Sequence, residues 1–280
     1  MSRQLIVNAD DFGRTRGGSA GILRAYHEGI VTSTTAMMNM PGVAADLHLA
    51  QQDAPRLGLG VHLNFTAGRP LLPTEWCASL VDEHGRFLAQ EAIMANPDRL
   101  KPDELQAELK SQITAFKNAL NRLPDHLDAH HFVHLYPPLF EVYLELADSF
   151  KLPARIPFPR HEADLEHLPP ILEHVPPATA QAIVRTDQQQ LAAHAVKTTD
   201  HFVATFFDRT VSVPFLMEIL GSLPQGSSEL MTHPGMLDDQ LRKESKYNAR
   251  REDELSVLTN SQVIEYLDRL DIKLITFAEL

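Results

Sequence analysis

Short apolar runs rich in branched residues recur along this 280-residue chain, and segments with helical spacing follow them. Such runs are typical of buried parallel strands, and the segments between them are typical of crossover helices. The expected strands are residues 5–9, 33–38, 59–63, 126–131, 154–158, 230–233 and 274–277. The alternation predicts an α/β fold built on a barrel of parallel strands.

Three of the expected helices have clear apolar faces. In residues 104–120, apolar side chains recur at intervals of four and three, and Asp103 and Glu104 precede them, where a helix dipole favours acids. A second helix is expected after Pro137 and Pro138, and a third from Ser261, whose hydroxyl could cap it.

Two stretches of the sequence interrupt the alternation of expected strands and helices. Residues 66–98 look like a loop, and residues 159–190 are rich in Pro, Glu and Gln with little clean period. Both are expected to be insertions into a single domain spanning residues 1–280. They would either cover a substrate cleft or form ordinary surface excursions.

The composition of the chain limits the classes of partner that it can bind. A net charge of −12, with no run rich in Lys or Arg, argues against nucleic acid as a partner. The first apolar stretch, residues 5–7, is too short for a signal peptide or a membrane span, so a cytoplasmic protein without a membrane partner is expected. The single cysteine, Cys77, excludes an internal disulfide framework and a Cys-rich zinc module.

Polar residues gather where the expected strands end, which is where parallel barrels carry their catalytic groups. The first strand leads into Asp10 and Asp11. If the backbone is still extended there, the two carboxylates point in different directions and can take different roles, one binding a metal and the other acting as a base. The alternative is a solvated acidic turn.

The strand at 126–131 carries a cluster of histidines. His126, Asp128 and His130 share one face at period two, and polar groups on an inward face must be paired or coordinated. His130 is therefore the best ligand candidate, with Asp128 as an orienting partner. A structural role is expected for His126, and packing or surface roles for His131 and His134.

His62 lies in another expected strand and would complete a set with Asp11 and His130. Two imidazoles and one carboxylate hold Zn²⁺ or Fe²⁺ while leaving positions open for water and substrate. The dinucleotide fingerprint, the phosphate-binding loop and the GxSxG motif are missing from the sequence, and Cys77 has no catalytic setting. Nucleotide chemistry and a covalent serine or cysteine nucleophile are therefore disfavoured.

Several motifs together resemble the YdjC-like carbohydrate deacetylases. The resemblance covers nearly the whole chain and rests on IVNADDFG, GIVTSTTAMMN, LGVHLN, HLDAHHFVH, ELMTHPG and LITF, in that order. It implies a distorted β/α barrel and a metal-dependent N-deacetylase that releases acetate from N-acetylated amino sugars or chitooligosaccharides. It also implies a small carbohydrate substrate, one divalent metal ion, Mg²⁺ or Zn²⁺, and a homodimer.

The resemblance also assigns roles to residues. It implies that Asp11, His62 and His130 bind the metal, that Asp10 is the general base, with Arg155 as its electrostatic partner, and that His233 is the general acid. The surrounding positions expected to contact the substrate or the metal ligands are Asn39, Asn64 and Asp128. Phe132 stands where family members commonly have a third consecutive histidine, which affects the surroundings of the site rather than the ligand set.

Two alternatives stay open. A glycoside hydrolase would use paired carboxylates, such as Asp10 with Asp128, about 5–9.5 Å apart and without a metal, but it leaves the histidines unexplained. A catalytically silent sugar-binding barrel would have no need of the intact Asp and His set.

Overall fold

The computed structural model describes residues 2–159, 172 and 175–280 of the chain. The chain forms two compact units, one of residues 1–62 and 199–280 and the other of residues 63–198.

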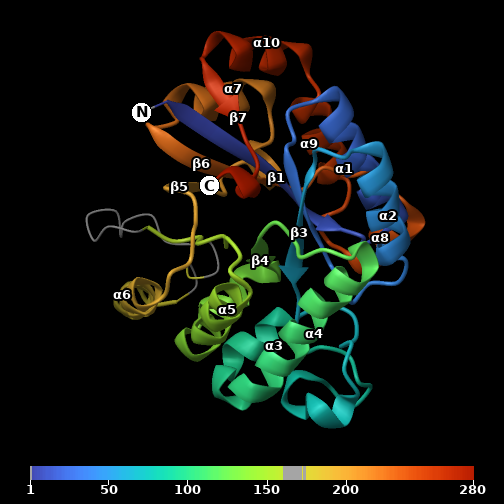
Figure 1. Cartoon of the computed structure of the whole chain (residues 1–280), viewed down its shortest axis with the longest axis vertical. Coiled ribbons are helices and arrows are strands. Elements are labelled where there is room, and N and C mark those ends of the chain that lie inside the picture. The colour runs from blue at the N-terminus through green and yellow to red at the C-terminus, as the bar shows by residue number, and fades with distance from the viewer. Residues whose placement is uncertain (1, 160–171, 173–174) are drawn as a thin grey trace. The chain divides into compact units, whose positions relative to one another are not determined.

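The first unit is built on a parallel sheet that curls into part of a barrel (Figure 1). Its strand order is β3-β2-β1-β6-β5, and β7 pairs with the first residues of β1. The strands are β1 (Arg3–Phe12), β2 (Ser33–Ala36), β3 (Gly58–Leu63), β5 (His201–Val203), β6 (Gly226–Thr232) and β7 (Ile272–Leu274). Residues 5–12 of β1 are buried without interruption, as expected for a central strand covered on both faces.

Helices surround this sheet (Figure 1). They are α1 (Arg16–Glu28), α2 (Val43–Asp53), α7 (Val213–Ser222), α8 (Asp239–Glu244), α9 (Arg250–Leu258) and α10 (Ser261–Arg269). The Thr15 hydroxyl caps α1 by accepting from the Gly18 N–H at 3.1 Å, so the helix begins directly after the loop that leaves β1.

The described part of the second unit contains a short strand and four α-helices. They are β4 (Leu127–Ala129), α3 (Gln90–Ala95), α4 (Pro102–Leu120), α5 (Pro137–Phe150) and α6 (Pro177–Ala193). Leu127 forms an isolated parallel bridge with Ala154, and the Tyr143 hydroxyl donates to the Leu127 carbonyl at 2.9 Å. The loop before Arg155 is thereby fixed beside β4.

The apolar runs predict most of the strands. The expected strands at 5–9, 33–38, 59–63 and 230–233 correspond to β1, β2, β3 and β6. The strand expected at 126–131 is wrong beyond Ala129, because His131 and Phe132 adopt left-handed φ angles of 63° and 56° that turn the chain. Residues 154–158 form only the bridge at Ala154, and the strand expected at 274–277 ends at Leu274.

The helix predictions have a similar outcome. The helices expected at 104–120 and after Pro137 are α4 and α5, whereas α10 is capped by Asn260 rather than by Ser261. Residues 177–190, expected as loop, belong to α6. Its buried face consists of Ala180, Val184 and Asp187, so an acid interrupts the apolar period. The rest of the 159–190 stretch lies largely outside the described residues.

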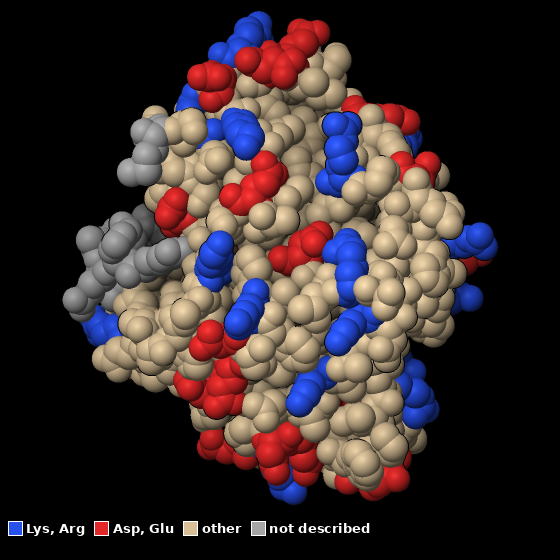
Figure 2. All heavy atoms as spheres, viewed as in Figure 1, with Lys and Arg blue, Asp and Glu red and all other residues tan. Residues whose placement is uncertain are grey.

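Parallel strands with surrounding helices confirm the predicted α/β barrel-type class. Basic and acidic side chains are interspersed on the face shown in Figure 2. Among the helices of the described residues, none combines the length and apolar character needed to cross a bilayer.

Candidate metal and catalytic centre

The two adjacent carboxylates at the end of β1 lie in a bulge. The register of β1 against β2 shifts between Ala9 and Phe12, and Asp11 has a φ of 70°. Left-handed backbone is uncommon for a residue other than glycine, and such strain collects at functional sites. Asp10 and Asp11 do meet different neighbours, as expected, but because of this bulge rather than because the strand stays extended.

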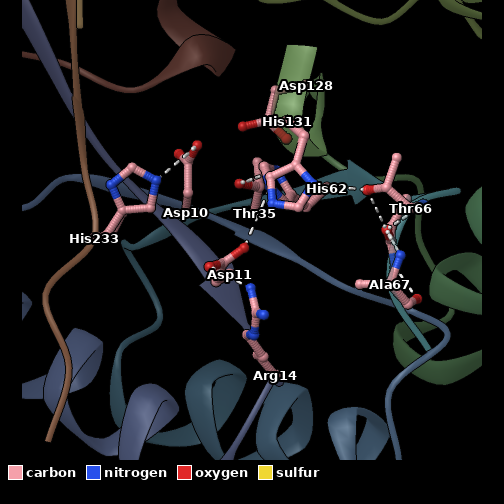
Figure 3. A network of polar contacts seen from close by, with 12 residues as sticks. Asp10, Asp11, Arg14, Thr35, His62, Thr66, Ala67, Asp128, His131 and His233 are labelled. Carbon is pink, nitrogen blue, oxygen red and sulfur yellow. Dashed lines mark hydrogen bonds and ion pairs between the residues drawn. The ribbon is translucent and has the colours of Figure 1, made fainter. Parts of the chain in front are cut away.

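Asp11 is buried between two arginines and a histidine. Its Oδ2 accepts from Arg14 Nη1 at 3.2 Å and from Arg251 Nη2, while its Oδ1 lies 3.4 Å from His62 Nε2. Both guanidinium groups are buried with it. They hold one carboxylate oxygen and orient the other toward His62, as Figure 3 shows for Asp11, Arg14 and His62.

The other nitrogen of His62 has a partner of its own. His62 Nδ1 lies 3.4 Å from Thr35 Oγ1, which also accepts from Asn8 Nδ2 at 3.3 Å. With the ring proton on Nδ1, facing this hydroxyl, the Nε2 lone pair faces Asp11. A ligating imidazole is commonly oriented in this way by a hydrogen bond from its second nitrogen.

The separation of Asp11 Oδ1 and His62 Nε2 fits a shared cation. Two ligands at about 2.0–2.1 Å from one tetrahedral ion are about 3.3–3.4 Å apart, and the observed distance is 3.4 Å. Carboxylate oxygen and neutral imidazole are both ordinary ligands of zinc and of other divalent ions. The donor set in the first unit therefore suits a divalent metal.

Asp10 points to a different group. Its Oδ1 accepts from Asn8 Nδ2 at 2.8 Å, and its Oδ2 lies 3.9 Å from His233 Nε2, directly after β6 (Figure 3). Burial lowers the pKa of His233 to about 4; the Asp10 carboxylate opposes this shift, and the nearby Arg251 cation adds to it. His233 is therefore neutral near pH 7.

A buried carboxylate, Glu254 on α9, holds the other side of His233. Its Oε2 accepts from the His233 backbone N–H at 2.6 Å, and its Oε1 lies 3.9 Å from His233 Nδ1 and accepts from the Tyr247 hydroxyl. Burial raises the pKa of Glu254 to about 7, although the donors around it act in the opposite direction. His233 thus stands between two carboxyl groups.

Close backbone packing fixes the loop that carries His233. A Cβ on Gly21 of α1 would lie 2.5 Å from the backbone of Gly235 and Met236. The Gly235 N–H donates to the Arg251 carbonyl at 3.1 Å, and the Met236 N–H donates to the Gly17 carbonyl at 3.0 Å. Glycine at position 21 allows this approach, which holds residues 233–236 against α1 and α9.

In the second unit, Asp128 and Arg155 form a buried ion pair. Arg155 Nη1 lies 3.0 Å from Asp128 Oδ2, and both side chains are at most 1 % exposed. His130 is buried directly after β4, and its ring stacks on that of His131 with centroids 3.7 Å apart. Thr66 Oγ1 lies 3.0 Å from His131 Nδ1, so His131 has a specific partner in this unit (Figure 3).

The two asparagines expected near the substrate occupy turns. Asn64 accepts at Oδ1 from the Thr66 and Ala67 N–H groups, both at 3.1 Å, and donates to the Ala67 carbonyl at 2.7 Å. Its side chain therefore shapes the turn that leaves β3. Asn39 is half-buried in the turn after β2.

The first unit brings together four of the expected residues, Asp10, Asp11, His62 and His233. It adds residues that the sequence analysis missed: Asn8, Arg14, Thr35, Tyr247, Arg251 and Glu254. A signal existed for two of them, since Arg251 and Glu254 are charged residues on the same helix face as Leu255 and Leu258. Charges on a buried helix face need partners.

This fold and site define a class: a parallel α/β protein with buried carboxylates and imidazoles at the carboxyl ends of its strands, where such folds place their active sites. The chain belongs to the YdjC-like protein family, whose model matches residues 4–269. This confirms the resemblance inferred from the motifs.

Similar proteins cover the whole chain. A carbohydrate deacetylase from Thermoanaerobacter pseudethanolicus is 33 % identical over 99 % of this chain and 98 % of its own length. A chitooligosaccharide deacetylase from Proteus mirabilis is 32 % identical over 100 % of both chains. A crystal structure from Enterococcus faecalis V583, named a "putative cellobiose-phosphate cleavage protein", is 30 % identical with a TM-score of 0.84 and covers 100 % of this chain and 99 % of that one.

Proposed function

We propose that this protein is a metal-dependent carbohydrate N-deacetylase that removes acetyl groups from N-acetylated amino sugars or chitooligosaccharides. The observation that carries the proposal is one buried cluster in the first unit, where Asp11 faces His62 and Asp10 faces His233. The cluster separates a possible ligand pair from a possible acid–base pair, an arrangement suited to metal-assisted hydrolysis of an amide. The names of the curated relatives support the substrate class.

The proposed metal ligands are Asp11, His62 and His130. The first two have the separation expected of ligands to one ion, and Arg14 and Arg251 fix which oxygen of Asp11 faces His62. His130 belongs to the second unit, and its ligation is a prediction from the sequence. When bound, a divalent cation at this site would polarise the amide carbonyl and make water a stronger nucleophile.

The chain's own residues then move the protons. Asp10 accepts a proton from the attacking water, whose oxygen forms the new bond to the acetyl carbon. Since His233 is neutral near pH 7, the proton that it donates must reach it during the reaction, and Asp10 Oδ2, 3.9 Å away, can deliver it. Protonation of the sugar nitrogen by His233 allows the C–N bond to break, giving acetate and a free amine.

The remaining expected residues have supporting roles in this proposal. Arg155 is the proposed electrostatic partner of Asp10, and in the second unit it forms the ion pair with Asp128. Asp128 and Asn39 are proposed to contact the substrate or the residues around the metal. Asn64 is proposed to act through the turn that its side chain organises.

A glycoside hydrolase is the second candidate, because the similar structure from Enterococcus faecalis carries a name that refers to cellobiose phosphate. Within the first unit, the buried carboxyl groups beside His233 do not favour it. Asp10 and Glu254 each lie 3.9 Å from this imidazole, on opposite nitrogens. The imidazole of His233 therefore occupies the space between the two carboxyl groups. In a glycosidase this space would hold the glycosidic bond that is cleaved.

Product analysis separates the candidates. Chitooligosaccharides of two to four sugars are incubated with the purified protein, and acetate, free amines and shorter sugars are measured. The proposal predicts acetate and free amine in equal amounts with sugar length unchanged. Shorter sugars would favour the glycosidase, and binding without any product would favour the silent sugar-binding protein.

The proposal also includes one bound Mg²⁺ or Zn²⁺, a homodimer and a cytoplasmic location. Imidazole ligands favour zinc, whereas a site with few ligands and a carboxylate also accepts magnesium. Metal analysis of protein purified without added metal, sedimentation and cell fractionation test these three points.

A further inference from the structure

Phe207, in the first unit, is a large apolar side chain that is 40 % exposed and lies beside the proposed acid, His233. Its ring is 5.4 Å from that of His233 between centroids, in an edge-to-face arrangement with an interplanar angle of 67°. The chemistry proposed above uses the imidazole of His233 and assigns nothing to the phenyl ring.

Within the aromatic cluster, Phe207 is contacted on one face and at one edge. Phe207 stacks on Tyr247 with centroids 4.2 Å apart and an interplanar angle of 19°. His233 meets both rings at their edges, at 5.4 Å and 5.8 Å. Tyr247 therefore covers one face of the phenyl ring and His233 occupies an edge. Phe207 as a whole is 40 % exposed, so a large part of its surface outside these two contacts is open to solvent.

The turn that carries Phe207 is rigidly built. The Phe207 N–H donates to Thr210 Oγ1 at 2.9 Å, and the Thr210 hydroxyl donates back to the Phe207 carbonyl at 2.7 Å. Asp208 has a φ of 52°, in the left-handed region that Asp adopts more readily than most residues other than glycine. The hydrogen bonds between Phe207 and Thr210 therefore fix the turn from which the phenyl ring projects.

One carboxylate connects this turn to the acid. The Tyr247 hydroxyl accepts from the Asp208 N–H at 3.2 Å and donates to Glu254, which also accepts from the His233 N–H at 2.6 Å. Tyr247 and Glu254 thus fix the position of the phenyl ring relative to the imidazole. A subsite needs such a fixed position in order to present a substrate group to a catalytic residue.

We propose that the exposed part of the Phe207 ring binds a pyranose ring of the substrate. This inference rests on the proposed function and deepens it by naming the residue that recognises the sugar. A pyranose presents a face of axial C–H groups, which are weakly positive, and an aromatic face is negative, so the two surfaces attract and exclude water. The acid–base pair recognises the acetamide, and Phe207 recognises the ring that carries it or adjoins it.

The test compares acetate release from the N-acetylglucosamine dimer by wild type, Phe207→Ala, Phe207→Leu and Phe207→Trp. Loss of the ring in the Ala and Leu variants is expected to raise KM about 3- to 10-fold with kcat changed less than twofold, and Trp is expected to restore KM. Leu retains an apolar side chain against Tyr247, so it separates loss of the flat ring from loss of packing. Leu49→Ala, which truncates an apolar side chain of the same unit that is 52 % exposed, is the matched control and should leave KM unchanged.

The outcomes are distinguishable. An unchanged KM in Phe207→Ala, in an enzyme that releases acetate, would overturn the sugar platform and leave the deacetylase proposal intact. A kcat loss shared by all three Phe207 variants would show that the ring serves only to position His233, which also overturns it. Absence of acetate with the wild-type protein would contradict the proposed function itself.

Discussion

Replacing Asp10 by Asn tests the proposed proton transfer with little change in shape. Asp10 is 2 % exposed, and the amide oxygen of Asn can still accept from Asn8 Nδ2, which lies 2.8 Å from Oδ1. The variant should therefore fold, with a thermal unfolding midpoint within a few degrees of wild type. What it loses is the base and the negative charge facing His233.

The distance from Asp10 Oδ2 to His233 Nε2 sets the size of the expected loss of kcat. At 3.9 Å, a carboxylate stabilises an imidazolium by about 4 kcal/mol at an effective dielectric constant of 20. A barrier raised by about 4 kcal/mol lowers kcat about 10³-fold, within the range of about 10²–10⁴ usual for a general base. The affinity for metal should stay within about threefold, since the proposed ligands are other residues.

The assay measures kcat and KM for acetate release, together with metal affinity by titration calorimetry. Asp53→Asn is the matched control, because it makes the same substitution in an exposed pair with His27, where side chains are 41 % and 55 % exposed. It should leave kcat unchanged. A kcat of Asp10→Asn within tenfold of wild type would refute the assignment of Asp10 as the base.

Two further predictions concern the metal site and stability. His62→Ala should lower the affinity for Zn²⁺ at least about tenfold in a calorimetric titration, because it removes a proposed ligand. The exposed control His27→Ala should leave this affinity unchanged. Equal affinities in the two variants would contradict ligation by His62. Burial raises the pKa of Asp187 in α6 from 3.8 to about 9. Its native pKa exceeds its unfolded pKa, so the native state binds the extra proton and stability falls as pH rises from about 4 to about 9, by at most about 7 kcal/mol. Asp187→Asn should flatten this dependence and raise the free energy of urea unfolding at pH 8, and an unchanged slope between pH 5 and pH 8 would contradict the argument.

The sequence predicts those parts of the fold that depend on local pattern. Continuous apolar runs identify the central strands, since a parallel strand covered on both faces has apolar residues on both sides. β1 is the clearest case. The apolar period of α4 is equally plain. The helix α6 was missed because Asp187 replaces an apolar residue on its buried face, and its stabilisation comes from tertiary packing.

The sequence predicts which residue types stand at the strand ends, but not the contacts around them. Asp10, Asp11, His62 and His233 stand at strand ends, where chemistry is expected from topology alone. The φ of 70° at Asp11 depends on how β1 pairs with β2, which no local pattern reveals. Arg251 contacts Asp11 across 240 positions of the sequence, so its role becomes visible only when α9 packs beside β1.

The turn after β4 shows the same limit. Period two placed His126, Asp128 and His130 on one strand face, but the strand ends at Ala129 and the chain turns at His131 and Phe132. Consecutive left-handed residues other than glycine are rare enough that a sequence pattern favours continuing the strand. His130 nevertheless follows β4 directly, although the strand is shorter than expected.

Metal dependence is tested most directly by measuring acetate release from a chitooligosaccharide by protein treated with a chelator and then reloaded with Zn²⁺ or Mg²⁺. Release is expected to stop when the metal is removed, to return when it is restored, and not to return in His62→Ala. Release that continues at the wild-type rate in metal-free protein would show that deacetylation by this family member does not depend on a metal.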